Sequence, residues 1–382
     1  MSRVRNTTIP LIIIFFFMAV VASGCAEKRV LERMGLIVAA GYDPLQKNRM
    51  LGTVVLYQID PNAKEKVNVI ANTAYTSKGF RSAMNVESSK KLVSGQLRVA
   101  LYNESLARKG VINLVDTLSR DSDIGTGVYL TVSEGRAFDI LSHRYPEVSN
   151  IGTYLFQTIK QNVTGERMIS PTLHEFLHAY FSVGKDPVLP YVQRRGNEVL
   201  VNQIAYFKND KMVGLGSLQE AFHLKLLRDR FRSGTIELSL RYHPMAKYAI
   251  RKKATKDDVY YIVIEQISSN CKIKLVDKKT PSFKVSIDLT ARLQEISEQF
   301  DLSNPEALKE IQNEINKKME LMIVKFLKKT QQMQIDPAGF GKKYLASVRN
   351  PQLTKEKWRQ MYSSAKFNIT VDTTLVRVGV TK

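Results

Sequence analysis

The sequence is poor in the residues that build disulfides and most metal or redox centres. It has two cysteines, one tryptophan and five histidines among 382 residues. Cys25 lies at an expected processing site, which leaves Cys271 as the one free thiol of the chain and excludes an intramolecular disulfide. Cys271 follows three polar residues, 268–270, that predict a turn, and we interpret it as a structural or incidental thiol. The fold must therefore depend on packed hydrophobic cores.

Long hydrophobic runs are absent after residue 24. The longest later runs, such as residues 36–40, have the length of strands and predict buried core rather than membrane spans. The exception is the apolar run at residues 9–21, which follows Arg3 and Arg5. This run has about 13 residues and contains Pro10, whereas a helix that spans a bilayer needs about 20.

The apolar run ends in a short motif, because residues 22–25 read Ala-Ser-Gly-Cys. Basic residues, a short apolar run and small residues before a cysteine together predict a lipoprotein signal. We expect residues 1–24 to be removed and Cys25, carrying diacylglyceryl and acyl groups, to become the new N-terminus. A plain secretory signal is the alternative. Both interpretations predict that the mature chain is exported.

Acidic residues are few relative to basic ones. The chain has 57 lysines and arginines against 36 aspartates and glutamates, a net charge of +21. Removal of Arg3 and Arg5 with the signal leaves about +19. Such a balance favours an anionic partner, either nucleic acid or an acidic lipid surface. Export and the lack of a nucleic-acid-binding motif favour the lipid surface, and a surface charge that only maintains solubility is the alternative.

The length of the mature chain predicts more than one domain. Removal of the signal leaves 358 residues, which is long for a single core. Pro187 and Pro190 lie close together and predict the main break. We therefore expect an N-terminal domain at residues 25–187 and a C-terminal domain at 188–382. The latter could be split again near residues 270–282.

Periodicity predicts an α+β fold with mixed, mostly antiparallel sheets flanked by helices. Asn304 and Pro305 are suited to cap and begin a long amphipathic helix at residues 305–332. The expected strands are 34–41, 50–59, 67–75, 98–102, 128–132, 198–207, 235–242, 259–268, 272–277, 283–293 and 367–380. The other expected helices are 78–93, 104–118, 136–142, 150–163, 172–183, one that follows Ser217 and a short one around Trp358.

One motif has the pattern of a zinc hydrolase. Residues 174–178 read His-Glu-Phe-Leu-His, which on a helix places His174 and His178 one turn apart as zinc ligands. Glu175 would then act as the general base for a bound water molecule. Glu198, twenty residues after His178, is the candidate third ligand.

A structural interpretation of the same residues is better supported. Thr172 and Glu175 have the spacing of a capping box, in which Glu175 accepts a hydrogen bond from the backbone of the cap residue. His174 would lie in the first turn, where the helix dipole disfavours a cation. Glu198 lies beyond the proline-rich break. We therefore predict no catalytic residues, no metal and no cofactor, and keep the zinc hydrolase as an alternative.

Several short motifs occur, each once and in a specific order, along nearly the whole mature chain. They are Gly41-Tyr42-Asp43, residues 95–99, Leu189-Pro190, residues 204–214, and the series 336–341 (Asp-Pro-Ala-Gly-Phe-Gly) followed by Trp358. Together they resemble the Ger(x)C family, the lipoprotein C subunits of bacterial spore germinant receptors. In two departures, Ala26-Glu27 stands where Trp-Asp is usual, and the His-Glu-Phe-Leu-His motif is not a family feature.

The resemblance implies a non-enzymatic subunit attached through Cys25 to the outer face of the spore inner membrane. It implies assembly with a polytopic B subunit and with an A subunit of mixed soluble and membrane parts. Leu189-Pro190 is similar to the linker of the family. We expect this linker and the exposed side of the helix at 305–332 to contribute contacts with the partners.

A solute-binding lipoprotein would carry the same anchor and is a second alternative. Such proteins normally have two α/β lobes with parallel sheets and alternating strands and helices. The consecutive strands expected between residues 235 and 293 disagree with that pattern. The sequence therefore favours the receptor subunit.

Overall fold

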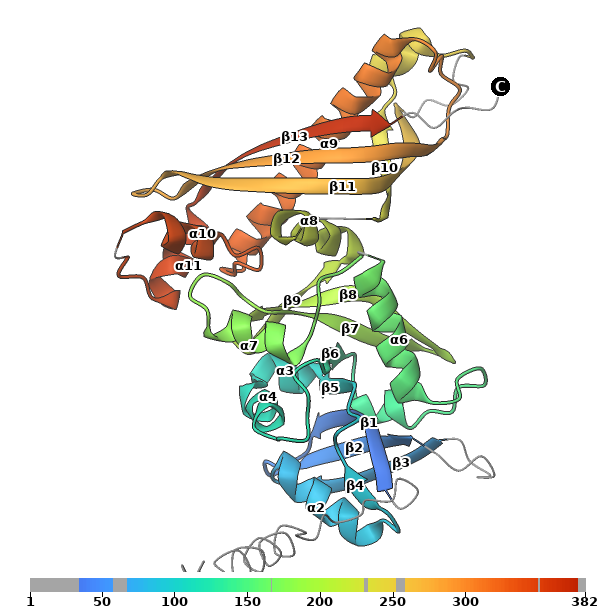
Figure 1. Cartoon of the computed structure of the whole chain (residues 1–382), viewed down its shortest axis with the longest axis vertical. Helices are drawn as coiled ribbons and strands as arrows, with labels where there is room; N and C mark the ends of the chain where they lie inside the picture. Colours follow the sequence, from blue (N-terminus) through green and yellow to red (C-terminus); the bar gives the residue numbers. More distant parts are fainter. Residues whose placement is uncertain are drawn as a thin grey trace, which may run out of the picture.

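A computed structural model describes residues 34–57, 67–165, 167–229, 233–251, 258–349 and 351–376. The predicted signal, Cys25 and the end of the predicted last strand lie outside these ranges. The described chain forms an elongated molecule in which two sheets lie one beyond the other (Figure 1). None of its described helices is long and apolar enough to cross a bilayer.

The first sheet has nine strands within the described residues, in the order β3-β2-β1-β5-β6-β7-β8-β9, with β4 paired to β1. Its centre is parallel, since β1, β5, β6 and β7 pair in that sense, and its outer pairs are antiparallel. The strands are β1 (Met34–Pro44), β2 (Met50–Tyr57), β3 (Val67–Ala74), β4 (Lys91–Val93), β5 (Val99–Asn103), β6 (Tyr129–Ser133), β7 (Val188–Arg195), β8 (Glu198–Lys208) and β9 (Lys211–Ser217).

Helices cover both faces of the first sheet because its central strands are apolar on both sides. In β5, Val99 and Leu101 join one core cluster, and Ala100 and Tyr102 join the other. The first cluster contains α5 (Ala137–Leu141) and α6 (Ile151–Thr164). The second contains α2 (Ser77–Glu87), α3 (Glu104–Lys109), α4 (Ile112–Ser119) and α7 (Leu173–Phe181).

The prediction that Leu189-Pro190 forms a linker is not what the structure shows. Both residues lie in β7, whose first six residues are buried, and they pair with Ala205 and Ile204 of β8. Pro190 removes one N–H donor but keeps its carbonyl, and burial on both faces holds the strand in place. The first sheet therefore continues across the break predicted at residues 187 and 188 and ends at Ser217.

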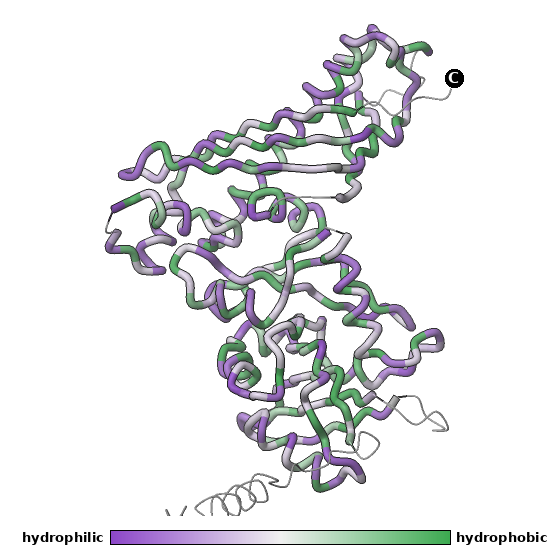
Figure 2. The backbone as a smooth tube through the Cα atoms, in the orientation of Figure 1, coloured by the Kyte–Doolittle hydropathy of each residue, from purple (hydrophilic) through white to green (hydrophobic). Residues whose placement is uncertain are grey.

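The second sheet has four strands in the part of the chain that the structure describes, in the order β10-β11-β12-β13. Along its strands hydrophobic and hydrophilic residues alternate, as expected when one face is covered (Figure 2). The last pair, β12 with β13, is parallel. The elements of this half are β10 (Thr235–Arg241), the 3-10 helix η2 (His243–Tyr248), β11 (Val259–Asp277), β12 (Ser282–Ile296), α9 (Pro305–Gln332), α10 (Phe340–Ser347), α11 (Lys355–Ser363) and β13 (Lys366–Val376).

The two strands predicted at 259–268 and 272–277 form a single strand, β11. The polar residues that predicted a turn pair with β12 instead, with Asn270 opposite Asp288 and Cys271 opposite Ile287. The register of pairing with β12 shifts between Gln266 and Ser268, and this irregularity lets the strand continue through the polar residues. Because β11 and β12 pair along almost their whole lengths, the second sheet is continuous through residues 270–282.

The long helix α9 begins as predicted, since the side chain of Asn304 accepts a hydrogen bond from the backbone of Glu306 at 3.0 Å. It also covers the edge of the second sheet. Glu320 accepts from the backbone N–H of Val371, and Asn316 accepts from that of Thr373, both at 3.0 Å. These bonds satisfy donors of β13 that an edge strand leaves unpaired.

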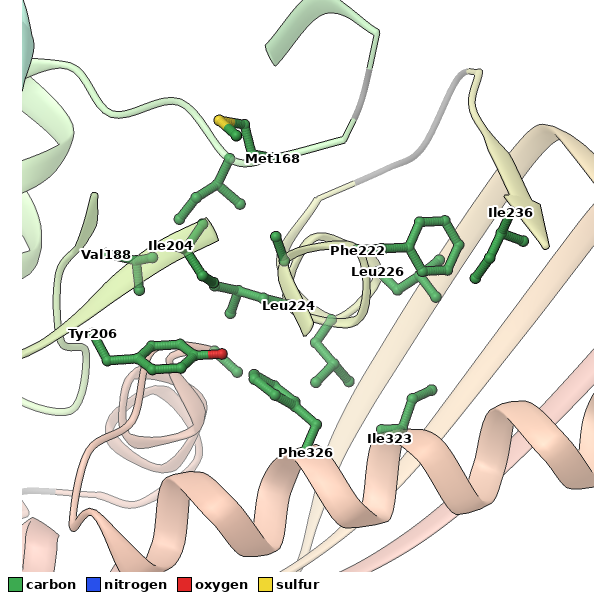
Figure 3. Packing of buried hydrophobic residues seen from close by; sticks show 14 of the residues in the cluster. Met168, Val188, Ile204, Tyr206, Phe222, Leu224, Leu226, Ile236, Ile323 and Phe326 are labelled. Atoms are coloured by element: carbon green, nitrogen blue, oxygen red, sulfur yellow. The ribbon is translucent and has the colours of Figure 1, made fainter. Parts of the chain in front are cut away.

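Helix α8 (Leu218–Arg228) joins the two sheets. Ser217 caps it with a complete capping box that includes Glu220, as the sequence suggested for Ser217. The helix is buried on nearly all sides rather than on one face, because the first sheet and α9 both pack against it. Figure 3 shows Leu224 facing Ile204 of β8, while Phe326 projects toward α8 from α9 below it. One hydrophobic cluster therefore extends through both halves of the molecule.

Candidate functional site

The helix that carries the His-Glu-Phe-Leu-His motif, α7, begins as predicted. The side chain of Thr172 accepts a hydrogen bond from the backbone N–H of Glu175 at 3.2 Å. His174 and His178 lie one turn apart with parallel rings whose centroids are 6.1 Å apart. The motif therefore does place two imidazoles on one face of a helix.

The carboxylate of Glu175 has a different role from the predicted one. It was expected to return to the backbone of Thr172, but its Oε2 lies 3.4 Å from Nζ of Lys185 and 3.2 Å from Nη2 of Arg228. These two cations hold the pKa of Glu175 below its ordinary value, against the opposing effect of burial. Glu175 is thus an ion-pair partner. The sequence missed both cations because Lys185 lies in the loop after α7 and Arg228 lies 53 positions after Glu175 along the chain.

The surroundings of His178 disfavour a zinc ion. Its Nε2 lies 3.1 Å from Nζ of Lys342, and burial together with Lys342 and Lys185 lowers the pKa of His178. The proposed third ligand, Glu198, lies at the end of the β7–β8 hairpin, opposite Arg195. In the described part of the chain, no group of three or more histidine, cysteine, aspartate or glutamate side chains is arranged to hold a metal ion.

Cys271 lies in β11 rather than in the predicted turn. The thiol is half-buried, and burial raises its pKa to about 11. A thiol with a raised pKa is mainly protonated at neutral pH and is a weak nucleophile. The predicted interpretation of Cys271 as a structural thiol is consistent with this environment.

A buried carboxylate with four hydrogen-bond donors, Asp336, joins the two halves of the molecule. Its Oδ1 accepts from the backbone N–H groups of Gly339 and Phe340 at 2.8 and 3.1 Å. Its Oδ2 accepts from the backbone N–H of Gly341 at 2.8 Å and from the indole Nε1 of Trp358 at 3.0 Å. Asp336 is 1% exposed. Burial raises its pKa to about 7, although the backbone donors act in the opposite direction.

The backbone of Asp336 pairs with a second buried carboxylate, Asp186, which precedes β7. The N–H of Asp336 donates to Asp186 Oδ2 at 2.8 Å, and the N–H of Asp186 donates to the carbonyl of Asp336 at 3.0 Å. Arg359 of α11 donates to Asp186 Oδ1 at 3.2 Å and to Asn209 Oδ1 at 2.7 Å. We call Asp186, Asn209, Asp336, Trp358 and Arg359 the aspartate joint.

Two glycines let the backbones approach closely at the aspartate joint. Gly184 has a φ of +81°, and a Cβ atom built on it would lie 2.4 Å from Cα of Gly341. A Cβ atom on Gly341 would in turn meet the ring of Trp358 at 2.7 Å. The motif at residues 336–341 is therefore more than the end of α9. It fastens α10 and α11 to the loops of the first sheet.

Two family models match the chain, and they divide it within the β7–β8 hairpin of the first sheet. Residues 27–194 match the model described as the spore germination protein N-terminal domain, and residues 202–379 match the C-terminal model described as spore germination B3/GerAC like. The chain belongs to this spore germination family. The predicted resemblance to the Ger(x)C family is thereby confirmed.

Individual relatives match over almost their whole lengths. Spore germination protein GerQC of Bacillus cereus is 27% identical over 375 residues, which cover 97% of this chain and 99% of the relative. Spore germination protein KC of Bacillus subtilis is 23% identical, with 97% and 96% covered. The crystal structure of the GerBC protein matches 88% of this chain and 97% of its own, with a TM-score of 0.56 at 18% identity. That likeness confirms the predicted mixed α+β fold.

Proposed function

We propose that this spore germination protein is the lipid-anchored C subunit of a nutrient germinant receptor. The observation that carries the proposal is the match of both halves of the chain to the spore germination family, and the signal predicted at residues 1–24, before Cys25, supports it. In this role the chain has no catalytic activity of its own. It lies on the outer face of the spore inner membrane and assembles with a polytopic B subunit and with an A subunit.

The position of the first strand suits a short tether. Met34, the first described residue, pairs with Lys91 of β4 at the end of the molecule that carries α2 (Figure 1). A fully extended chain covers at most about 3.6 Å per residue, so the steps from Cys25 to Met34 reach about 30 Å. An anchor on Cys25 would keep this end of the first sheet close to the bilayer.

The assembly is tested by affinity purification of the tagged chain from detergent-solubilised spore membranes, with mass spectrometry of the proteins that elute with it. We expect two membrane proteins in a defined ratio, matching the A and B subunits. Recovery of the lipidated chain alone, under conditions that keep other membrane complexes intact, would refute the receptor proposal.

The anchor is tested by Cys25→Ser. Without the thiol no diacylglyceryl group can be attached, and we expect the chain to move from the membrane fraction to the soluble fraction of lysed spores. Nutrient-triggered germination should fall in parallel. Cys271→Ser is the matched control and should stay with the membrane. A Cys25→Ser chain that has lost residues 1–24 and still remains membrane-bound after a high-salt wash would contradict a lipid anchor at this residue.

A partner contact on the exposed stripe of α9 remains part of the proposal. Lys309, Lys325 and Lys328 are exposed along this helix, and Leu321 between them is 69% exposed. An exposed leucine among basic residues is suited to an interface with a partner of opposite charge. Leu189 and Pro190, in contrast, are buried in β7, so they do not present a surface to a partner.

If α9 contacts a partner, changes on its exposed side should weaken assembly without changing the stability of the chain. The double change Lys325→Glu and Lys328→Glu should leave the unfolding free energy within about 0.5 kcal/mol of wild type, because both side chains lie in solvent. It should nevertheless reduce recovery of the partner subunits in the affinity experiment. The same reversals at Lys272 and Lys274, exposed on β11, are the control and should not reduce it. Equal recovery with both double variants would sink the contact.

A further inference from the structure

A polar cleft of about 580 Å³ opens where five segments from both halves of the molecule meet. Its wall is formed by α7, by the residues before β7, by the end of α8, by β11 and by the start of α10. The charged residues that line it are Glu175, Lys185, Arg228, Asp229, Lys342 and Lys343. We call this space the basic cleft.

The charges in the basic cleft are unbalanced. Four basic side chains face two carboxylates, which leaves two positive charges. Lys185 and Arg228 are the innermost, with side chains that are each 10% exposed, and both contact the same oxygen of Glu175. Asp336 lies behind the wall, but its two oxygens already accept four N–H groups.

Two carboxylates are limited compensation for the inner cations, because Lys185 and Arg228 share one oxygen of Glu175 and Asp229, the other acidic neighbour of Arg228, is exposed to solvent. Removing a charge from water is costly unless a partner of opposite charge and good geometry replaces the lost solvation. The titration of Lys185 reflects this cost, because burial and the neighbouring Arg228 lower its pKa to about 8. Burial likewise lowers the pKa of Arg228. An anion in the cleft would relieve both effects.

We propose that the basic cleft is a binding site for a small oxyanion with two or more negative charges, of the phosphate or carboxylate type. Arg228 supplies a planar fork of donors that suits such oxygens, and Lys185 supplies a second inner cation. Lys342 and Lys343, both exposed on α10, receive the anion at the mouth.

A bound anion would link the two sheets. Lys185 belongs to a loop of the first sheet, whereas Lys342 and Lys343 belong to the helix that packs against β11 of the second. A ligand that contacts both sides favours the arrangement in which they are close, to the extent that it binds that arrangement more tightly. The site is independent of the anchor at Cys25, so its failure would leave the receptor proposal unaffected.

The test uses the detergent-solubilised, full-length mature chain at constant ionic strength set with chloride. Three probes are titrated separately: inorganic phosphate, citrate and micelles containing lysophosphatidate. Binding is measured in two ways, by the melting temperature of the chain and by the rate at which N-ethylmaleimide alkylates Cys271. Cys271 lines the cleft, and peptide mass spectrometry locates the label. We expect saturable stabilisation and at least threefold slower alkylation with one or more of these probes. The micelle arm separates a lipid headgroup from a free anion.

Two variants decide the site. The double variant Lys342→Gln with Lys343→Gln changes exposed residues only. It should raise the dissociation constant of the anion about tenfold, equivalent to about 1.4 kcal/mol of binding free energy. Lys185→Gln should abolish saturable binding. The control, Lys309→Gln with Lys325→Gln, removes equal charge from α9 and should bind as wild type does. Stabilisation that does not saturate, or that the control loses as strongly as the cleft variants, would overturn the proposal.

Discussion

Asp336→Ala is expected to lower the free energy of unfolding by about 3 to 5 kcal/mol, the loss typical of removing one member of a buried ionic network. The change leaves the three backbone donors of residues 339–341 and the indole N–H of Trp358 without their acceptor. Each buried donor that remains unsatisfied costs about 1 to 3 kcal/mol, and partial relaxation toward water keeps the total below the full sum.

Two milder changes at the same place should form a graded series. Asp336→Asn keeps the shape but turns an NH2 group toward one of the two donor pairs, either Gly341 with Trp358 or Gly339 with Phe340, so we expect a loss of about 2 kcal/mol. Trp358→Phe removes one donor and keeps an aromatic ring, and should cost about 1 kcal/mol.

Chemical denaturation of the purified chain measures the series at the aspartate joint. The matched control is Asp372→Ala, an exposed aspartate on β13, which should change stability by less than about 0.5 kcal/mol. If Asp336→Ala were as stable as this control, the joint would not hold the two halves together. Because the joint fastens α10 and α11 to the first sheet, loss of Asp336 should also lower the amount of chain recovered from spores.

His223→Leu is expected to remove a large part of the decrease in unfolding free energy that the wild-type chain undergoes as the pH falls. His223 lies in α8, is 2% exposed, and neither ring nitrogen has a hydrogen-bond partner within the described structure. Burial lowers its pKa from 6.5 to about 4. The unfolded chain therefore binds the proton of His223 more readily than the folded chain between these values. The contribution of His223 to stability is thus complete above pH 6.5 and declines as the pH falls toward 4.

The size of the effect follows from the pKa difference at His223. A difference of about two and a half units corresponds to about 3 kcal/mol of stability lost near pH 4. His223→Leu should match or exceed the wild-type stability at pH 7, since it removes two unsatisfied buried nitrogens. Its advantage should grow by about 3 kcal/mol between pH 7 and pH 4.

Denaturation curves across this pH range test the role of His223. His243→Leu, a change at an exposed histidine of η2, is the matched control and should follow the wild-type pH dependence. Parallel curves for wild type and His223→Leu would show that water or another group reaches the His223 ring. They would then contradict its burial as a neutral side chain.

Local signals in the sequence were sufficient for much of the secondary structure. The caps at Asn304 and Ser217 and the start of α7 at Thr172 were predicted because a cap and its helix are neighbours in the chain. The same locality produced two errors. Residues 268–270 and Pro187 with Pro190 have the composition of breaks, but their pairing with distant strands keeps them within or beside regular sheet.

The sequence by itself determined the class of fold, the family and the expected lipid anchor, because periodicity, caps and motif order are carried by residues close together in the chain. Only the tertiary structure decided how the pieces meet. It placed Glu175 between Lys185 and Arg228, joined Asp186 to Asp336, and extended the first sheet through β9. These contacts join residues as much as 150 positions apart, and their free energy depends on burial and charge that no local pattern records.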